Sequence, residues 1–333
     1  MLASLFRSKK PAPEPPPGPQ LGMVCLKGEL GLTPDRICRA WAKFFPALPP
    51  IFHKGTSPDA PKSPTPRGDS AVIELNVSGR AVMVAAMPMP IPGNDIPAAC
   101  EVSWMWPDAA KHLAAHKAHA IILTTPDGDP VAEALDISRI AACVCAAGEG
   151  LGIYWGNGGH VHKPRFFLDA LNAFDPAGDG EPPSMLWDGL RISGTPPVPG
   201  GSRIPGTPPV PGAAAPPSIP RAAPPSPATP PTPRKPGTPA PPPVPGGSAS
   251  APCTLTTHGM TNFGHHELEI IDTHMPVGDL RLLAFSTTAY LLKRGPILKH
   301  NQTFGRTATE KFKVEHTTSR FRENEPVIRL HVP

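Results

Sequence analysis

The stretch AVIELNVSGRAVMVAAM, residues 71–87, decides the fold class of this 333-residue chain. Two runs of alternating apolar residues flank Ser78 and Gly79, a two-residue connection typical of antiparallel strands. Because side chains alternate along a strand, the apolar residues of the first run share one face: Ile73, Leu75 and Val77. The prolines of MPMPIP, residues 87–92, end the second run, since proline cannot donate to a sheet ladder. The stretch therefore predicts a β-hairpin.

Helices and strands alternate around this hairpin. Apolar periodicity predicts a strand, a helix that begins at Thr33 and Pro34, the hairpin, two helices and a strand. In chain order these elements occupy residues 22–28, 32–45, 71–87, 94–105, 107–116 and 118–125. This βαββαβ order is that of ferredoxin-like modules.

The rest of the chain continues the alternation. Helices are predicted at 130–147, from Pro164 onward and at 276–293, and strands at 151–155, 185–193, 253–257, 266–271, 310–316 and 326–332. We therefore predict an α+β fold with ferredoxin-like βαββαβ elements. The chain order of these helices and strands also fits two related halves that pack together as one domain.

Proline divides the chain into parts. Of the 52 prolines, most fall in a tail, in a loop near residues 53–70 and in a low-complexity tract that repeats GTPPVPG at 194 and 206. Such a sequence buries too little apolar surface to offset its ordering entropy. We predict a disordered Pro-rich tail (1–20), the N-terminal part of an α+β domain (21–193), a disordered Pro-rich insertion (194–252) and the C-terminal part of the same domain (253–333).

The charge does not point to nucleic acid. The chain carries a formal +4, but residues 1–20 contribute +2 and residues 194–252 contribute +4, so the remainder is near −2. A basic face for nucleic acid is therefore not indicated. No run of 18 apolar residues suggests a membrane span, and the six cysteines form no CxxC pair. We expect a cytoplasmic protein with reduced, buried cysteines.

Histidines and an acidic residue form one candidate metal site: His160, His162, His258, His265 and Glu267. Imidazole and carboxylate side chains are ligands for divalent metals, and His265 and Glu267 lie on the same side of a predicted strand. The set requires that two distant loops converge. The alternative is an alternating strand with a polar, solvent-facing side.

A glycine-rich loop forms a candidate anion site: Gly156, Gly158, Gly159, Lys163 and Arg165. Glycines after a strand and before a helix can bring backbone N–H groups to an anion. The spacing GNGG, however, is that of neither a dinucleotide fingerprint nor a P-loop. A structural turn, with the preceding aromatic pair packed at its base, is the favoured interpretation.

Several stretches resemble one family. They are MPMPIP, WMWPDAAKHLAAHKAH, GIYWGNGGHVHKPRFFLDA, THGMTNFGHHELEI, AYLLKRGPIL and QTFGRTATEKFKVEH, in this order. Together they are similar to the bacterial family known as domain of unknown function 4261 (DUF4261). The resemblance covers about residues 21–193 and 253–331. It implies no established activity, and therefore no catalytic residues.

We expect a non-enzymatic protein-binding module in which the proline-rich tract is a spacer or a docking segment for another protein. No nucleophile elbow, HExxH sequence or nucleotide fingerprint supports an enzyme, and no cofactor is expected. One alternative is a metal-dependent or anion-binding enzyme that uses the His-rich loops. Another is a toxin-immunity or adaptor protein.

Overall fold

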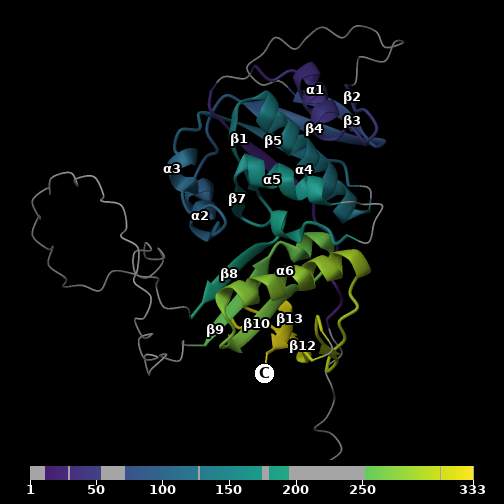
Figure 1. The fold of residues 1–333 in the computed structure, drawn as a ribbon, viewed down its shortest axis with the longest axis vertical. Helices are drawn as coiled ribbons and strands as arrows, with labels where there is room; N and C mark the ends of the chain where they lie inside the picture. Colours follow the sequence, from purple (N-terminus) through teal and green to yellow (C-terminus); the bar gives the residue numbers. More distant parts are fainter. Residues whose placement is uncertain are drawn as a thin grey trace, which may run out of the picture. The chain divides into compact units, whose positions relative to one another are not determined.

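The structure is a computed structural model that describes residues 12–28, 31–53, 72–126, 128–174, 180–194, 252–307 and 309–332. Helices alternate along the chain with the strands of two sheets, which confirms the predicted α+β content (Figure 1). The described residues on both sides of the proline-rich tract belong to one compact unit. The predicted disorder of residues 195–251, and of the loop at 54–71, falls outside the described residues.

The N-terminal sheet has seven strands in the order β2-β3-β4-β5-β1-β6-β7, and every neighbouring pair is antiparallel. Its strands are β1 (Leu21–Leu26), β2 (Phe52–His53), β3 (Val72–Val77), β4 (Arg80–Met87), β5 (Ala118–Thr124), β6 (Gly150–Trp155) and β7 (His160–His162).

The hairpin predicted from residues 71–87 is present. Val77 pairs with Arg80 across the turn. Ser78 and Gly79 have φ angles of 53° and 87°, the positive values that a two-residue type I′ connection requires at both positions. The right-handed twist of the strands favours this turn, so the local sequence alone specified the pairing of β3 with β4.

The strand order does not confirm the ferredoxin-like detail. In a split βαβ unit, the first strand and the strand reached through the first helix are parallel, with one strand between them. Here β4 and β5 separate β1 from β3, and β1 pairs with β5 and β6. Three successive antiparallel pairings also make β1 and β3 antiparallel. Local periodicity does not encode which strands become neighbours.

Helices cover both faces of this sheet. Val24, Ile153 and Trp155 point into the main core with α1, α4 and α5, whereas Cys25 and Tyr154 point into a second cluster with α2 and α3. This division follows from the alternation of side chains along β1 and β6. The helices are α1 (Pro34–Phe44), α2 (Asp95–Val102), α3 (Ala109–Leu113), α4 (Pro130–Ala147) and α5 (Pro164–Ala173).

The predicted helix cap at Thr33 is present, and the structure shows a second one at Asp129. Thr33 accepts a hydrogen bond from the Arg36 backbone N–H, and Pro34 opens α1. Asp129 accepts from the backbone N–H groups of Val131 and Ala132 at the start of α4. Each cap satisfies N–H groups that the helix itself cannot pair.

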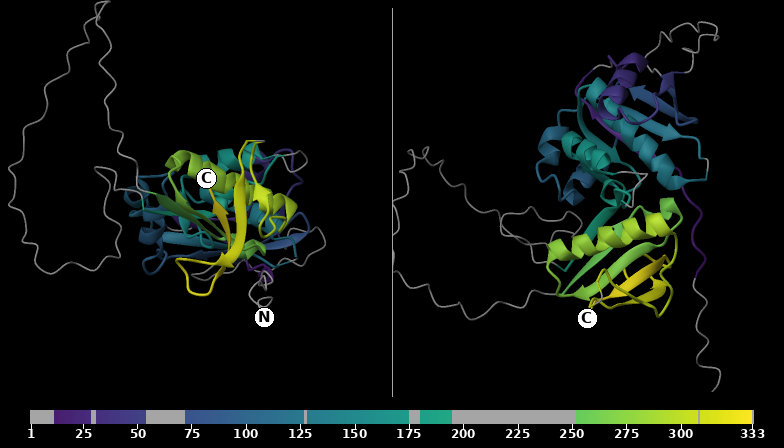
Figure 2. Two further views of the ribbon diagram at one scale, coloured as in Figure 1. Left: turned by 90° about the horizontal axis from the view of Figure 1, so that it is seen from below. Right: turned by 45° about the vertical axis from the view of Figure 1, so that its right-hand side comes forward.

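The C-terminal sheet has six strands in the order β11-β12-β13-β10-β9-β8. β10 and β13 are its parallel pair, and the chain passes through α6 (Val277–Arg294) between them. Figure 2 shows α6 lying across one face of this sheet. The strands are β8 (Gly189–Ser193), β9 (Cys253–His258), β10 (Glu267–Thr273), β11 (Thr303–Phe304), β12 (Phe312–Thr318) and β13 (Pro326–His331).

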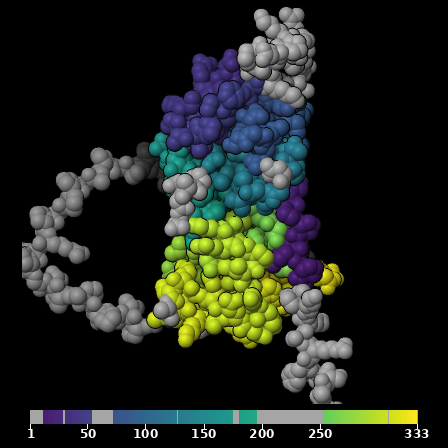
Figure 3. Space-filling model, turned by 90° about the vertical axis from the view of Figure 1, so that its right-hand side faces the viewer, coloured from purple at the N-terminus to yellow at the C-terminus, as the bar shows by residue number. Residues whose placement is uncertain are grey.

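Residues 12–20 differ from the predicted disordered tail. The Gly18 N–H donates to the Asn262 carbonyl oxygen at 3.2 Å. The Glu14 carboxylate accepts from the His266 N–H at 3.0 Å. Figure 3 shows this N-terminal segment, in purple, against the green and yellow C-terminal part. The disorder was predicted from the low content of apolar residues in this segment. Hydrogen bonds to residues far away in the sequence, which order the segment here, do not follow from composition.

The cysteines behave as the sequence indicated. All six are free thiols, and five of them are buried. Burial raises the pKa of Cys145 to about 12, so its thiol stays protonated and packs as a small apolar group. In the part of the chain that the structure describes, no helix has the length and apolar character needed to cross a bilayer.

Candidate functional site

A row of polar side chains crosses five strands of the C-terminal sheet. Arg191 on β8 pairs with Thr256 on β9, Thr256 with Glu269 on β10, Glu269 with Arg329 on β13, and Arg329 with Glu315 on β12. Directly paired residues point to the same face. The residues that alternate with this row are buried in the main core: Leu255, Leu268, Ile270, Ile328 and Leu330. The row therefore marks the face that points away from the core.

Residues 319–325, here named the cover loop, fold over this polar face. Glu269 accepts from the Ser319 hydroxyl at 2.5 Å and from the Arg320 backbone N–H at 3.2 Å. Its other oxygen accepts from Arg329 Nη2 at 2.9 Å. Glu269 and Arg329 have side chains only 1% and 9% exposed. A buried, fully bonded ion pair thus anchors the loop to the sheet.

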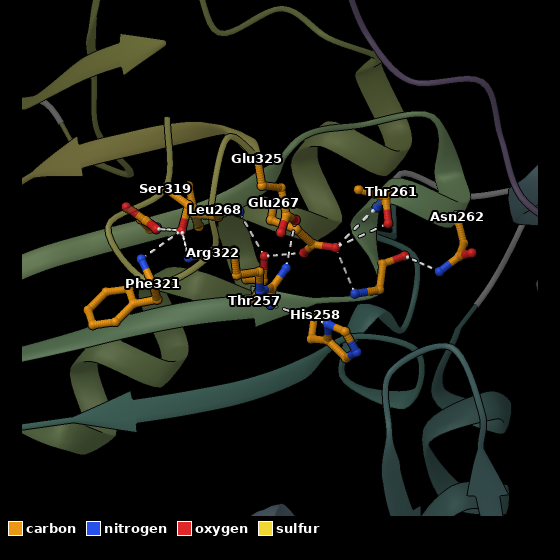
Figure 4. Close-up of polar contacts among 12 residues, drawn as sticks. Thr257, His258, Thr261, Asn262, Glu267, Leu268, Ser319, Phe321, Arg322 and Glu325 are labelled. Carbon is orange, nitrogen blue, oxygen red and sulfur yellow. Dashed lines mark hydrogen bonds and ion pairs between the residues drawn. The ribbon is translucent and has the colours of Figure 1, made fainter. Parts of the chain in front are cut away.

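Arg322 of the cover loop points toward β9 (Figure 4). Its Nη2 lies 3.0 Å from the Thr257 carbonyl oxygen and 3.2 Å from His258 Nδ1. Its Nη1 donates to Glu325 at 2.7 Å. A guanidinium can only donate, so Nδ1 of His258 accepts, and the hydrogen of the neutral ring lies on Nε2.

His258 is held in this neutral form by its surroundings. Partial burial lowers its pKa from the ordinary value, and the positive charges of Arg322 and Arg191 lower it further, whereas Glu267 and Glu325 oppose this shift. The two arginines therefore both act on the imidazole. At neutral pH the ring presents an N–H donor at Nε2, not a basic lone pair.

A pocket of about 350 Å³ lies beside this arrangement. It is lined by residues of β8, β9 and the cover loop: Arg191, Ile192, Ser193, Thr256, His258, Phe321 and Arg322. Arg191 is exposed, and its guanidinium has no carboxylate partner among the described residues. Phe321 is 53% exposed. The polar groups of the lining are two guanidiniums, an imidazole N–H and two hydroxyls.

Glu267 lies next to the pocket but is fully occupied. It is 2% exposed. It accepts from the Thr257 hydroxyl at 2.7 Å and from the N–H groups of Gly259 at 2.9 Å and Thr261 at 3.3 Å. These bonds cap the short 3₁₀ helix η2 (Met260–Phe263). The alternative of a solvent-facing polar side is therefore wrong at this residue, because the β9–η2 turn encloses the carboxylate.

His160 and His162 lie in a buried cluster behind the pocket, with their rings 4.5 Å apart. Burial lowers the pKa of His160 to about 4 and holds the pKa of His162 well below its usual value. Burial, and then the Glu267 charge, raise the pKa of Asp188 well above its usual range. Burial thus favours the neutral form of all three groups, and both rings carry an unbonded nitrogen and Asp188 an unbonded oxygen among the described residues.

Asp188 escaped the sequence analysis. It accepts from the His258 backbone N–H at 3.1 Å and so joins the start of β8 to the end of β9. A single aspartate in SMLWDGL, residues 184–190, carries no motif of its own. It directly precedes β8, and only the structure shows that it is buried.

The structure brings together only part of the predicted metal set. His160 and His258 are close enough for their charges to interact, and so are His258 and Glu267. His265 instead faces the N-terminal segment, where the Glu14 charge acts on it. No group of three or more histidine, cysteine or acidic side chains within the described ranges is arranged to hold a metal ion. The geometry therefore gives the metal hypothesis no support.

The predicted anion loop is a turn between two strands. Gly156–Gly159 connect β6 to β7, a short strand that the sequence analysis missed, so the loop does not open directly into a helix. The Gly156 N–H donates to Leu21 at 3.1 Å, and the Gly159 N–H donates to Trp155 at 2.9 Å. These N–H groups are thus bonded within the fold.

The basic residues of that candidate lie elsewhere. Lys163 is the N-cap residue of α5, and Arg165, inside the helix, pairs with Asp169 at 2.9 Å on an exposed surface. Gly158 packs instead against Gly189, where an added Cβ would overlap the Gly158 carbonyl oxygen. The favoured interpretation, a structural turn, agrees with these contacts.

Comparison with known proteins gives a match to the part of the chain that supplies Thr256, His258, Phe321 and Arg322 of the pocket, whereas Arg191, Ile192 and Ser193 lie outside the match. Residues 256–331 match the family model described as Domain of unknown function (DUF4261). The match runs from β9 to β13, and the resemblance expected over residues 21–193 lies outside it. No curated protein and no solved structure matches the chain. The similarity to DUF4261 therefore covers residues 256–331, which supply most of the C-terminal sheet, α6 and the cover loop.

Proposed function

We propose that the protein is a non-enzymatic binding module that takes an anionic group in the pocket between β8, β9 and the cover loop. The observation that carries this proposal is the chemistry of the lining. Arg191, Arg322 and His258 Nε2 offer donors only, and the hydroxyls of Ser193 and Thr256 can also donate. Charge-assisted hydrogen bonds to such donors are roughly twice as strong as neutral ones.

The nearby carboxylates do not compete for the pocket. Glu325 is paired with Arg322 Nη1, and Glu267 is saturated by the donors of the β9–η2 turn. Arg191 therefore keeps its full donor capacity toward a ligand. The volume of about 350 Å³ falls at the lower end of the range of small-ligand pockets, roughly 300–1,000 Å³.

Binding is favoured over catalysis by the state of His258. A general base needs a lone pair directed at the proton that it removes. Arg322 occupies the Nδ1 lone pair, and Nε2 bears the hydrogen, so the neutral ring can stabilise a bound anion but cannot act as a base. The enzymatic alternative stays a prediction, as does the toxin-immunity or adaptor role.

Titration calorimetry with inorganic phosphate, sulfate and citrate tests the proposal. Arg191→Ala should weaken binding about tenfold or more, since one charge-assisted hydrogen bond contributes roughly 1.5–3 kcal/mol. Arg165→Ala, which removes an exposed arginine on α5, is the matched control and should leave affinity unchanged. The proposal fails if none of the three anions binds, or if the two variants behave alike.

A protein partner recruited by the proline-rich tract is the second candidate function. Ser193 pairs with Thr254, and a Cβ on Gly194 would contact the Pro252 carbonyl oxygen, so the two ends of the tract leave the fold side by side. Ser193 also lines the pocket. A polyproline-II segment loses little entropy on binding, which favours a docking role for the tract.

Two replacements separate docking from spacing. In the first, a four-residue Gly-Ser turn replaces residues 196–250, which the adjacency of Ser193 and Thr254 permits. In the second, a Gly-Ser segment of equal length replaces them. If both variants lose a partner captured by the full chain, the tract docks; if only the short variant loses it, the tract is a spacer. An unchanged partner set with both variants removes this candidate.

A further inference from the structure

The pocket has an aromatic side as well as a cationic side. Phe321 lies in the cover loop with 53% of its surface exposed, and it lines the pocket. Its backbone N–H donates to the Ser319 hydroxyl at 3.0 Å, and Ser319 in turn donates to buried Glu269. The ring is therefore carried on an anchored segment and is not a loosely placed surface residue.

The cationic side suits a phosphate better than a carboxylate. Guanidiniums approach from two separate elements, Arg191 from the edge strand β8 and Arg322 from the cover loop, and His258 Nε2 adds a donor from β9. A carboxylate presents two oxygens in one plane. A terminal phosphate presents three oxygens around a tetrahedral centre and can accept from donors on several sides.

We infer that the pocket binds a nucleoside monophosphate, with its phosphate on Arg191, Arg322 and His258 and its base stacked on Phe321. This inference rests on the proposed function, because it requires the anion pocket. An exposed aromatic ring beside a cationic surface is a general platform for nucleobases. The pocket of about 350 Å³ limits the ligand to one nucleotide or a compound of similar size.

The test compares four probes by titration calorimetry: AMP, ribose 5-phosphate, adenosine and O-phospho-L-tyrosine. AMP should bind the wild-type protein about 5- to 150-fold more tightly than ribose 5-phosphate does, the range expected for one stacked base. Adenosine, which lacks the phosphate, should bind more weakly than both phosphorylated ribosides. Phe321→Ala should remove the preference for AMP over ribose 5-phosphate, and Phe321→Trp should retain it.

Phe52→Ala is the matched control, since Phe52 is also exposed, at 60%, but lies on β2 in the other sheet. Equal affinities for AMP and ribose 5-phosphate would overturn the nucleotide inference while the anion pocket stands. O-phospho-L-tyrosine binding more tightly than AMP would also overturn it, in favour of a phosphorylated protein ligand. If no phosphorylated probe binds while phosphate, sulfate or citrate does, this inference fails and the anion site stands; if none of them binds, both fail.

Discussion

Asp188 accepts a hydrogen bond from the backbone N–H of His258 at 3.1 Å, across a separation of 70 residues in the chain. The bond joins the residue that precedes β8 to the pocket residue His258 on β9. The proline-rich tract lies between the two partners in sequence, so its insertion leaves the site intact only because β8 and β9 are adjacent.

Asp188→Asn should change the pH dependence of stability. The folded-state pKa of Asp188 is raised well above its usual value, so the contribution of the protonated carboxyl to stability is present at low pH and is lost as pH rises through that raised pKa. Asparagine cannot ionise. The variant should match the wild type near pH 4 and become relatively more stable as pH rises, as measured by urea denaturation.

Asp169→Asn is the control for that measurement, since Asp169 is exposed and pairs only with Arg165. An exposed pair of this kind contributes about 0–1 kcal/mol. If Asp169→Asn and Asp188→Asn gave the same change with pH, burial of the Asp188 carboxyl would not be the cause.

His160→Phe should protect the protein against acid. The pKa of His160 falls from 6.5 to about 4 on folding, so its neutral form supports the native state above pH 6.5, and this contribution is lost as pH falls toward 4. The loss should be on the order of 3 kcal/mol. The His160→Phe variant should not lose this stability between pH 6.5 and 4. His112→Asn, on the exposed side of α3, should lose stability with falling pH as the wild type does. If urea denaturation shows the same loss of stability below pH 6.5 in His160→Phe as in the wild type, protonation of His160 is not its cause.

Arg329→Met should destabilise the protein strongly. It leaves the Glu269 carboxylate, 1% exposed, without its guanidinium partner. Removing one member of a buried ion pair typically costs about 3–5 kcal/mol. The double variant Arg329→Met/Glu269→Gln removes the uncompensated charge and should recover part of that loss in urea denaturation. If the double variant is less stable than Arg329→Met by the full cost of a second independent change, the two residues are not coupled.

Gly189→Ala should disrupt the contact between the glycine turn and β8. The added methyl group would overlap the Gly158 carbonyl oxygen, which is backbone and cannot rotate away. We expect a loss of about 2 kcal/mol or more in the free energy of unfolding. Gly278→Ala in α6 meets no atom within 4 Å and should be neutral or stabilising by up to about 1 kcal/mol. Equal thermal midpoints for the two variants would show that the close packing at Gly189 is not required.

Much of the secondary structure was predictable because its signals are local. The periodicity of residues 130–147 coincides with α4, and Ser78 and Gly79 favour the two-residue turn that joins β3 to β4. The strand β7 was missed because three residues are too few to show alternation. The resemblance to DUF4261 was found at residues 256–331, where the quoted stretches are densest.

The site was predictable only in fragments. His258 and Glu267 stood out by residue type, and the two do lie in one region. Their roles were not visible, because Arg322 and Arg191 approach His258 from 64 and 67 positions away in the chain. Phe321 carries no signal until the cover loop places it beside those arginines.

The sequence by itself determined where the helices and the longer strands form, since hydrogen bonding and side-chain alternation within a few residues specify them. The tertiary structure alone decided the order of the strands and whether each polar group is exposed or buried. The physical reason is that burial and charge pairing depend on neighbours far away in the chain: the same Glu267 would be a solvated surface residue on an open strand and is a buried cap once the β9–η2 turn closes over it.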